Sequence, residues 1–126
     1  MVAEGVVVVT DANYQQTVVG SPLPLLLGLG ARWSGAWHAL EPALQVIAQK
    51  LAGRLRVAAV DCDSNWEVVR AWAVFSYPTL ILLWRPPRDE GEGAIRGDLV
   101  EVARLVGPRS ARDLLAFVAP VLEEGA

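Results

Sequence analysis

Four short apolar runs, spaced by segments of different character, constrain the fold more than any other feature of this chain. They cover Val6–Val9 and residues 23–29, 54–60 and 80–84, and each has the length of a buried strand rather than of a helix. Between the second and third runs, apolar residues recur at helical spacing over residues 37–51. Strands that alternate with helices favour a sheet covered on both faces, so the pattern predicts a three-layer α/β domain.

The remaining segments complete this order. Asp11 is placed to cap a short helix that runs to Val19, and a second short helix is expected over residues 66–72. A long loop over 85–99 and a strand over 100–106 precede the last helix, where Ser110 and Asp113 suggest a capping box. The sequence therefore predicts one domain over 1–126, with a core at about 5–120, about five strands and four helices. Three tryptophans are expected to be buried or half-buried in it: Trp66, Trp72 and Trp84.

Composition excludes several classes of function. A net charge of −3 gives no electrostatic basis for nucleic-acid binding. One cysteine, Cys62, and one histidine, His38, allow no internal disulfide and no metal site built from a cluster of such residues. Residues 18–31 are apolar but are broken by Pro22 and Pro24, so no membrane span is expected. The first residues lack the pattern of a signal peptide, and the compartment stays open.

Several residues in register resemble the thioredoxin superfamily. Residues 33–38 read WSGAWH and open the long helical pattern, where that superfamily carries W-C-G-x-C-K. Pro42 matches the proline that kinks this helix, and Pro78, 44 positions after Ser34 (78 − 34 = 44), matches the cis-proline. Gly107 matches the glycine after the last strand. The resemblance implies a thioredoxin fold, a three-layer αβα arrangement around a mixed sheet, and a cis bond between Tyr77 and Pro78.

Three tripeptides narrow the resemblance further. Residues 60–62, 77–79 and 107–109 read VDC, YPT and GPR. These tripeptides are similar to those of the a-type domains of protein disulfide isomerase rather than to those of small bacterial thioredoxins. They favour a protein-disulfide-isomerase-like domain.

The chain departs from the family at the residues that carry its chemistry. Ser34 and Trp37 occupy the two cysteine positions, and neither can form a disulfide. By the same resemblance, members of the superfamily carry a buried acid where this chain has Gly28 and often a lysine facing it where this chain has Ala59. Both side chains are therefore absent here. We therefore expect no catalytic residue, no cofactor, no metal and no enzymatic activity in the vestigial motif, which comprises Trp33, Ser34, Gly35, Ala36 and Trp37.

These losses predict a redox-inactive, non-catalytic module that binds or scaffolds proteins. The expected groove lies beside the cis-proline loop and is lined by Trp33, Trp37, Tyr77 and Pro78, because tryptophan and tyrosine dominate binding hot spots. Core packing of the two tryptophans is an equal alternative to partner contact. The loop over 85–99 is either solvated or a second contact. The expected partner is a protein, and this chain is either a separate binding module or a subunit of a larger complex. No small-molecule cofactor is expected.

The alternative function rests on Cys62. It is either a small buried apolar residue or the thiol of a monothiol redox or intermolecularly disulfide-linked protein. Asp61 and Asp63 flank it and would raise its pKa.

A hydrolase is the third reading. Ser34, His38 and Glu41 share one helical face, but hydrolysis also needs an oxyanion hole, which one helix rarely provides. Helix capping is the expected role of Ser34.

Overall fold

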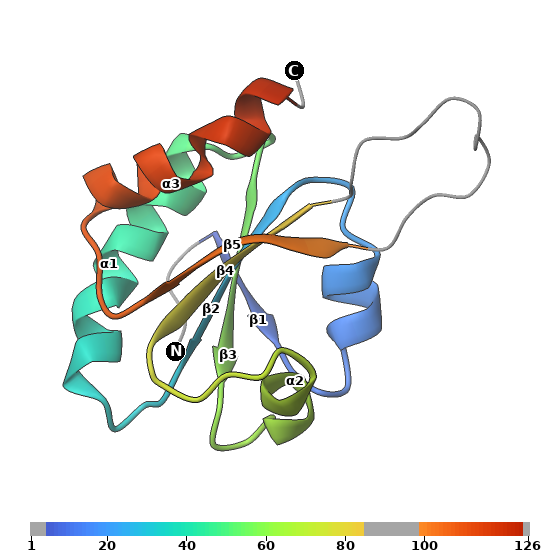
Figure 1. Ribbon diagram of the computed structural model, residues 1–126, viewed down its shortest axis with the longest axis vertical. Helices are drawn as coiled ribbons and strands as arrows, with labels where there is room; N and C mark the ends of the chain where they lie inside the picture. Colours follow the sequence, from blue (N-terminus) through green and yellow to red (C-terminus); the bar gives the residue numbers. More distant parts are fainter. Residues whose placement is uncertain (1–4, 85–98, 125–126) are drawn as a thin grey trace.

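A five-stranded mixed sheet forms the centre of the computed structural model, which describes residues 5–84 and 99–124 (Figure 1). The strand order is β1-β3-β2-β4-β5, with β1, β3 and β2 parallel and with β4 antiparallel to both β2 and β5. The predicted thioredoxin fold is confirmed. The elements are β1 (Val6–Val9), a π-helical segment (Gln15–Val19), β2 (Leu25–Gly30), α1 (Gly35–Lys50), β3 (Arg56–Asp61), α2 (Trp66–Ala71), β4 (Thr79–Trp84), β5 (Val100–Val106) and α3 (Ala111–Glu124).

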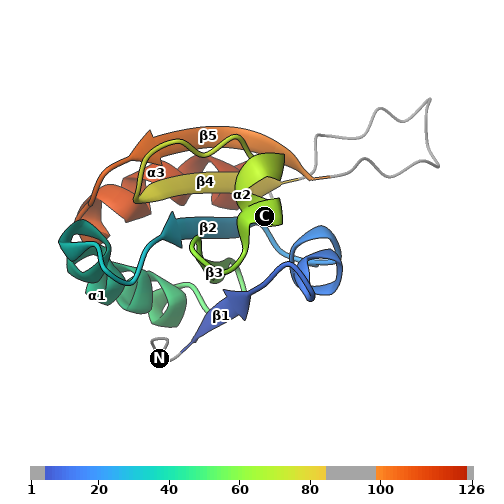
Figure 2. The same ribbon diagram turned by 90° about the horizontal axis from the view of Figure 1, so that it is seen from below.

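The central strand β2 is buried along its whole length and divides the core in two. Leu26 faces α1 and α3, whereas Leu25, Leu27 and Leu29 face α2 and the π-helical segment. Figures 1 and 2 show the same division, with α1 and α3 on one side of the sheet and α2 on the other. Each fully buried leucine contributes about 1.5–3 kcal/mol relative to an exposed one, so this strand is a main source of stability.

Two helices begin at the caps that the sequence predicts. Ser34 is the N-cap of α1, and its hydroxyl oxygen accepts a hydrogen bond from the Trp37 backbone N–H at 3.3 Å. Pro42 lies inside α1. At α3, the Asp113 N–H donates to the Ser110 hydroxyl at 3.1 Å and the Ser110 N–H donates to the Asp113 carboxylate at 3.4 Å, which confirms the capping box.

Asp11 has a different role from the predicted one. It caps no local helix, since the segment after it forms only the five-residue π-helical turn. Its carboxylate instead accepts hydrogen bonds from the N–H groups of Glu67 at 3.4 Å and Val68 at 3.0 Å, in the first turn of α2. The local N-cap, Asn65, makes no side-chain cap bond because its amide is bonded to the Asp11 N–H and the Asp61 carbonyl. A residue more than fifty positions away therefore caps α2.

Two of the three tryptophans expected to be buried or half-buried are half-buried, and the third is exposed. Trp72 is half-buried and its indole N–H donates to the Tyr14 hydroxyl at 2.7 Å. Trp84 is also half-buried. The prediction is wrong for Trp66, which is 59% exposed and lies under the Arg70 guanidinium, 4.9 Å from the ring centroid.

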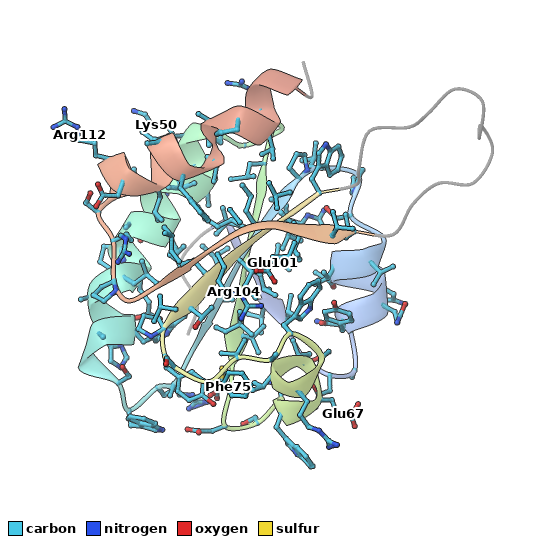
Figure 3. The ribbon with its side chains drawn as sticks, viewed as in Figure 1. Lys50, Glu67, Phe75, Glu101, Arg104 and Arg112 are labelled. Carbon is cyan, nitrogen blue, oxygen red and sulfur yellow. The ribbon has the colours of Figure 1, made fainter. Side chains whose placement is uncertain are left out.

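The edge strand β5 is tied to α2 by one side chain. Arg104 pairs with Glu101 at 2.7 Å and donates to the carbonyls of Trp72 at 2.7 Å and Ala73 at 3.2 Å (Figure 3). These carbonyls end α2, where a cation is favourable, and Ala73 has the left-handed φ of 52°. The predicted loop over 85–99 lies, apart from Leu99, outside the described residues.

Candidate functional site

The residues of the vestigial motif surround the start of α1. Trp33 lies before the helix, Ser34 caps it, and Gly35 and Ala36 form its first turn together with Trp37. Ser34 has an extended backbone conformation (φ −89°, ψ 122°), so Trp33 lies outside the helix and Trp37 lies inside it. Their four-residue separation therefore does not place them on one helical face.

Trp37 is a core residue rather than a groove residue. It is 6% exposed, and its ring lies on the α1-facing side of β2, above Gly28 and Gly30. A Cβ added at Gly30 would overlap the indole atoms Cε3 and Cδ2 and lie 2.8 Å from Cγ, and one at Gly28 would lie 3.3 Å from the ring. The Trp37 ring therefore packs in this position because residues 28 and 30 have no side chain. The expectation that Trp37 is an exposed anchor is corrected to the alternative of core packing.

Trp33 and Tyr77 form the exposed part of the predicted groove. Their ring centroids are 6.4 Å apart with an angle of 66° between the planes, an edge-to-face contact. Trp33 is 71% exposed, while Tyr77 is half-buried and Pro78 is buried. The Tyr77–Pro78 bond is cis, as the resemblance implies, and the Pro78 carbonyl accepts a hydrogen bond from the Gly107 N–H at 2.9 Å.

Phe75 is an exposed aromatic residue close in sequence to this surface, and it is missing from the predicted site. It lies in the segment between α2 and β4, two residues before Tyr77, and is 90% exposed (Figure 3). Its ring is therefore almost fully open to solvent. In the sequence, the sign of an exposed Phe75 is its position next to the cis-proline loop and outside any periodic apolar pattern.

Cys62 lies beside the same loop but under its surface. Its N–H donates to the Gly30 carbonyl at 2.8 Å, which holds it at the end of β3, and it is 4% exposed. Burial raises the pKa of the thiol to about 12; a hydrogen bond with the Tyr77 hydroxyl lowers the pKa, and the charges of Asp61 and Asp63 raise it. Cys62 is therefore a buried and protonated thiol in contact with the residue that precedes the cis-proline.

His38 is bonded away from Ser34, which removes the hydrolase arrangement. Its Nδ1 faces the Glu41 carboxylate at 3.1 Å and its Nε2 faces the Arg32 carbonyl. The carbonyl and then the carboxylate raise the pKa of the imidazole, since both contacts favour a ring that donates from each nitrogen. The Ser34 hydroxyl is engaged in the cap. The face shared by Ser34, His38 and Glu41 holds no nucleophile with an adjacent base.

Residues 5–84 and 99–124 contain neither a cluster of metal-binding side chains nor a membrane-spanning helix. Within those ranges, no group of three or more histidine, cysteine, aspartate or glutamate side chains is placed to hold a metal ion. No helix of this described part is long and apolar enough to cross a membrane.

Comparison with known proteins gives the family. The thioredoxin family matches residues 5–119 of the chain. The chain is 41% identical over 114 residues to the thioredoxin of Mycobacterium tuberculosis (strain H37Rv), a match that covers 90% of this chain and 87% of that protein. It is 35% identical over 100 residues to the bifunctional thioredoxin reductase/thioredoxin of Mycobacterium leprae, covering 75% of this chain and 22% of that one.

A solved structure supports the same fold. Chloroplastic thioredoxin z superposes with a TM-score of 0.72 over 99% of both chains, at 22% sequence identity. The chain belongs to the thioredoxin family.

These relatives overturn the predicted function. The sequence predicted a non-catalytic binding or scaffolding module without enzymatic activity, whereas the relatives are named as thioredoxins, proteins of dithiol–disulfide exchange. The error has a clear origin. Ser34 and Trp37 exclude exchange through the two usual sulfur positions, but they say nothing of the sulfur that the chain retains.

Proposed function

We propose that this chain is a thiol-redox protein of the thioredoxin family that works through one sulfur, Cys62, by forming a mixed disulfide with a partner protein. The observation that carries the proposal is the position of this thiol. The single cysteine of a chain 41% identical to a thioredoxin touches the tyrosine that precedes the cis-proline. A partner would dock on the exposed ring of Trp33, beside Tyr77 and the backbone of Pro78.

The proposed reaction is thiol–disulfide exchange. The Cys62 thiolate attacks one sulfur of a disulfide in the partner, the partner's S–S bond breaks, and a Cys62–partner disulfide forms. The second partner sulfur leaves as a thiolate and takes up the proton that Cys62 has lost. The thiolate of a low-molecular-weight thiol then attacks the partner sulfur of the mixed disulfide. The Cys62–partner bond breaks, a disulfide forms between the small thiol and the partner, and Cys62 takes up the proton that the small thiol has lost. Each step exchanges one S–S bond for another.

The surroundings of Cys62 make this exchange conditional. With a pKa of about 12, about one thiol in 10⁵ is ionised at pH 7, and the side chain is 4% exposed. Attack therefore requires the sulfur to become exposed and the Tyr77 side chain, which is hydrogen-bonded to the thiol, to move away from it. Partner binding at Trp33 is suited to cause this movement, because the Trp33 ring already contacts that of Tyr77.

Trapping of the mixed disulfide tests the proposal. Native protein is incubated with glutathione disulfide, and the adduct on Cys62 is followed by mass spectrometry. The rate is expected to rise about tenfold per pH unit between pH 7 and 9, since the thiolate fraction does so below the pKa. Tyr77→Ala is expected to raise the rate by about tenfold or more, because it uncovers the sulfur. Cys62→Ala should give no adduct.

Tyr77→Phe separates the effect of the Tyr77 ring from that of its hydroxyl. It keeps the ring and removes the hydroxyl that lowers the pKa of Cys62, so the adduct should form more slowly than in the wild type. If the native protein reacts only at its rate of global unfolding, and equally in both Tyr77 variants, Cys62 is a structural residue and the proposal fails.

Partner docking has its own test. A protein captured through Cys62 under oxidising conditions should be lost in Trp33→Ala and in Phe75→Ala. Trp66→Ala provides a matched control, since Trp66 is also an exposed tryptophan but lies on α2. Capture that falls equally in Trp66→Ala would show that docking does not use the Trp33 surface.

The narrower likeness to protein disulfide isomerase a-type domains stays a prediction. It rests on three tripeptides, two of which, at 60–62 and 77–79, contain Cys62 and Tyr77. The relatives named above are thioredoxins. Isomerisation of a scrambled disulfide-bonded substrate, compared between wild type and Cys62→Ala, would support the narrower assignment if the wild type alone were active.

A further inference from the structure

A cavity of about 630 Å³ lies on the α1 side of the sheet, among residues that the proposed redox function does not use. Its apolar walls come from β1, β3 and the first half of α1, and include Val6, Val8, Trp37, Leu44 and Ala59. Its volume is within the range of small-molecule sites, about 300–1,000 Å³. Cys62 does not line it.

The cavity lies between small residues of the sheet and the buried ring of Trp37. Ala59 presents only a methyl group, and Gly30 presents none, on the side of the sheet that faces α1. Trp37 packs on Gly28 and Gly30, and its indole lines the cavity beside them. Beside it, β1 is an edge strand and Val8 is 47% exposed. The opening is therefore accessible from solvent.

Two ion pairs surround the opening. Arg32 contacts Asp61 through Nε at 3.4 Å, and His38 Nδ1 lies 3.1 Å from the Glu41 carboxylate, which pairs with the ring when it is protonated. The Arg32 side chain is 80% exposed, and its two terminal nitrogens make no hydrogen bond to any residue within the described ranges. Those nitrogens are placed to bind an anionic group at the edge of an apolar chamber.

We propose that this cavity binds a small aromatic anion. The aromatic body would lie against the Trp37 ring and the methyl groups of Val8 and Ala59, where aromatic contacts and burial of apolar surface stabilise it. Its negative group would bind the terminal nitrogens of Arg32. The site is separate from the Cys62–Tyr77 contact, so it stands or falls independently of the redox proposal.

Two dyes with the same aromatic body test the assignment. 1-Anilinonaphthalene-8-sulfonate carries an anionic sulfonate, and N-phenyl-1-naphthylamine is its neutral counterpart. Both are expected to bind the native protein at one saturable site, the sulfonate several-fold more tightly. Arg32→Gln should remove this difference while it leaves the affinity of the neutral dye unchanged. Equal affinity of the two dyes, or a difference that persists in Arg32→Gln, would overturn the role of Arg32.

Filling the cavity tests its position. Ala59→Leu and Val8→Phe should each weaken both dyes by about tenfold or more, or 1.4 kcal/mol. Val8 is exposed and in an edge strand, so this variant keeps the test valid even if Ala59→Leu does not fold. Ala52→Leu, an exposed position beyond α1, is the matched control. Unchanged binding in both filled variants, or loss of binding in Trp33→Ala, would show that the dyes bind elsewhere and would refute the proposal.

Discussion

Trp33 and Trp37 are four residues apart, flank the same serine and belong to the same motif, but they do different work. Trp33 is 71% exposed and meets Tyr77 edge to face, whereas Trp37 is 6% exposed and packs on two glycines. The first is available to a partner and the second maintains the core and shapes a cavity. The motif that suggested one aromatic groove is therefore divided by the cap at Ser34 into a surface part and an interior part.

The largest expected effect comes from truncating each ring. Trp37→Ala should lower the free energy of unfolding by about 3–5 kcal/mol, since it leaves a cavity beside β2, whereas Trp33→Ala should change it by about 0.5 kcal/mol or less. Urea denaturation followed by circular dichroism measures both values. Equal losses in the two variants would erase the distinction between the surface and interior parts.

Gly30 sharpens the same comparison. Gly30→Ala should cost about 3 kcal/mol, because the new methyl group would overlap the Trp37 ring. In a Trp37→Ala background the same change should cost almost nothing, which gives a coupling free energy of about 3 kcal/mol in a double-mutant cycle. Additive losses would mean that Gly30 is required for some reason other than the indole.

Ser34 is the residue that separates the two tryptophans. Ser34→Ala should lower the stability by about 1 kcal/mol, since it removes the bond that the Trp37 N–H donates to the hydroxyl. Ser34→Asp should restore the lost stability, because aspartate is an equally good cap and favours the helix N-terminus. The measurement is again urea denaturation. An unchanged stability in Ser34→Ala would show that the long 3.3 Å bond contributes nothing.

The secondary structure of this molecule could be predicted from its sequence, whereas the contacts between distant segments could not. The strands, the caps at Ser34 and Ser110 and the cis bond before Pro78 follow from local patterns or from family register, and all of them are present. The cap that Asp11 gives to α2 depends on a pairing between distant segments, which no local pattern records. Likewise the exposure of Trp66 depends on how α2 lies on the sheet.

The candidate site shows the same limit in its chemistry. The absence of two sulfurs is visible in the sequence and indicates a loss of redox function, but whether Cys62 lies near the cis-proline depends on tertiary packing. The spacing of residues could not place its thiol under Tyr77. Nor could it show that a chamber lies beside Trp37 and Ala59, because a void depends on residues from three elements together.

The smallest expected effect concerns the hydrogen bond of His38 to the Arg32 carbonyl, which links the interior and surface parts of the motif. His38, next to Trp37, is bonded to the Arg32 carbonyl, next to Trp33, and this bond together with Glu41 raises its pKa above 6.5. A raised pKa means that the charged ring stabilises the fold fully below pH 6.5 and that this stabilisation is lost as the pH rises through the folded-state value. His38→Gln should therefore lower the melting temperature more at pH 5.5 than at pH 9. Because the pair is exposed, the difference should be small, and salt should reduce it further. A difference that is equal at both pH values would show that the ring holds the Arg32–Trp33 segment by its shape and not by its charge.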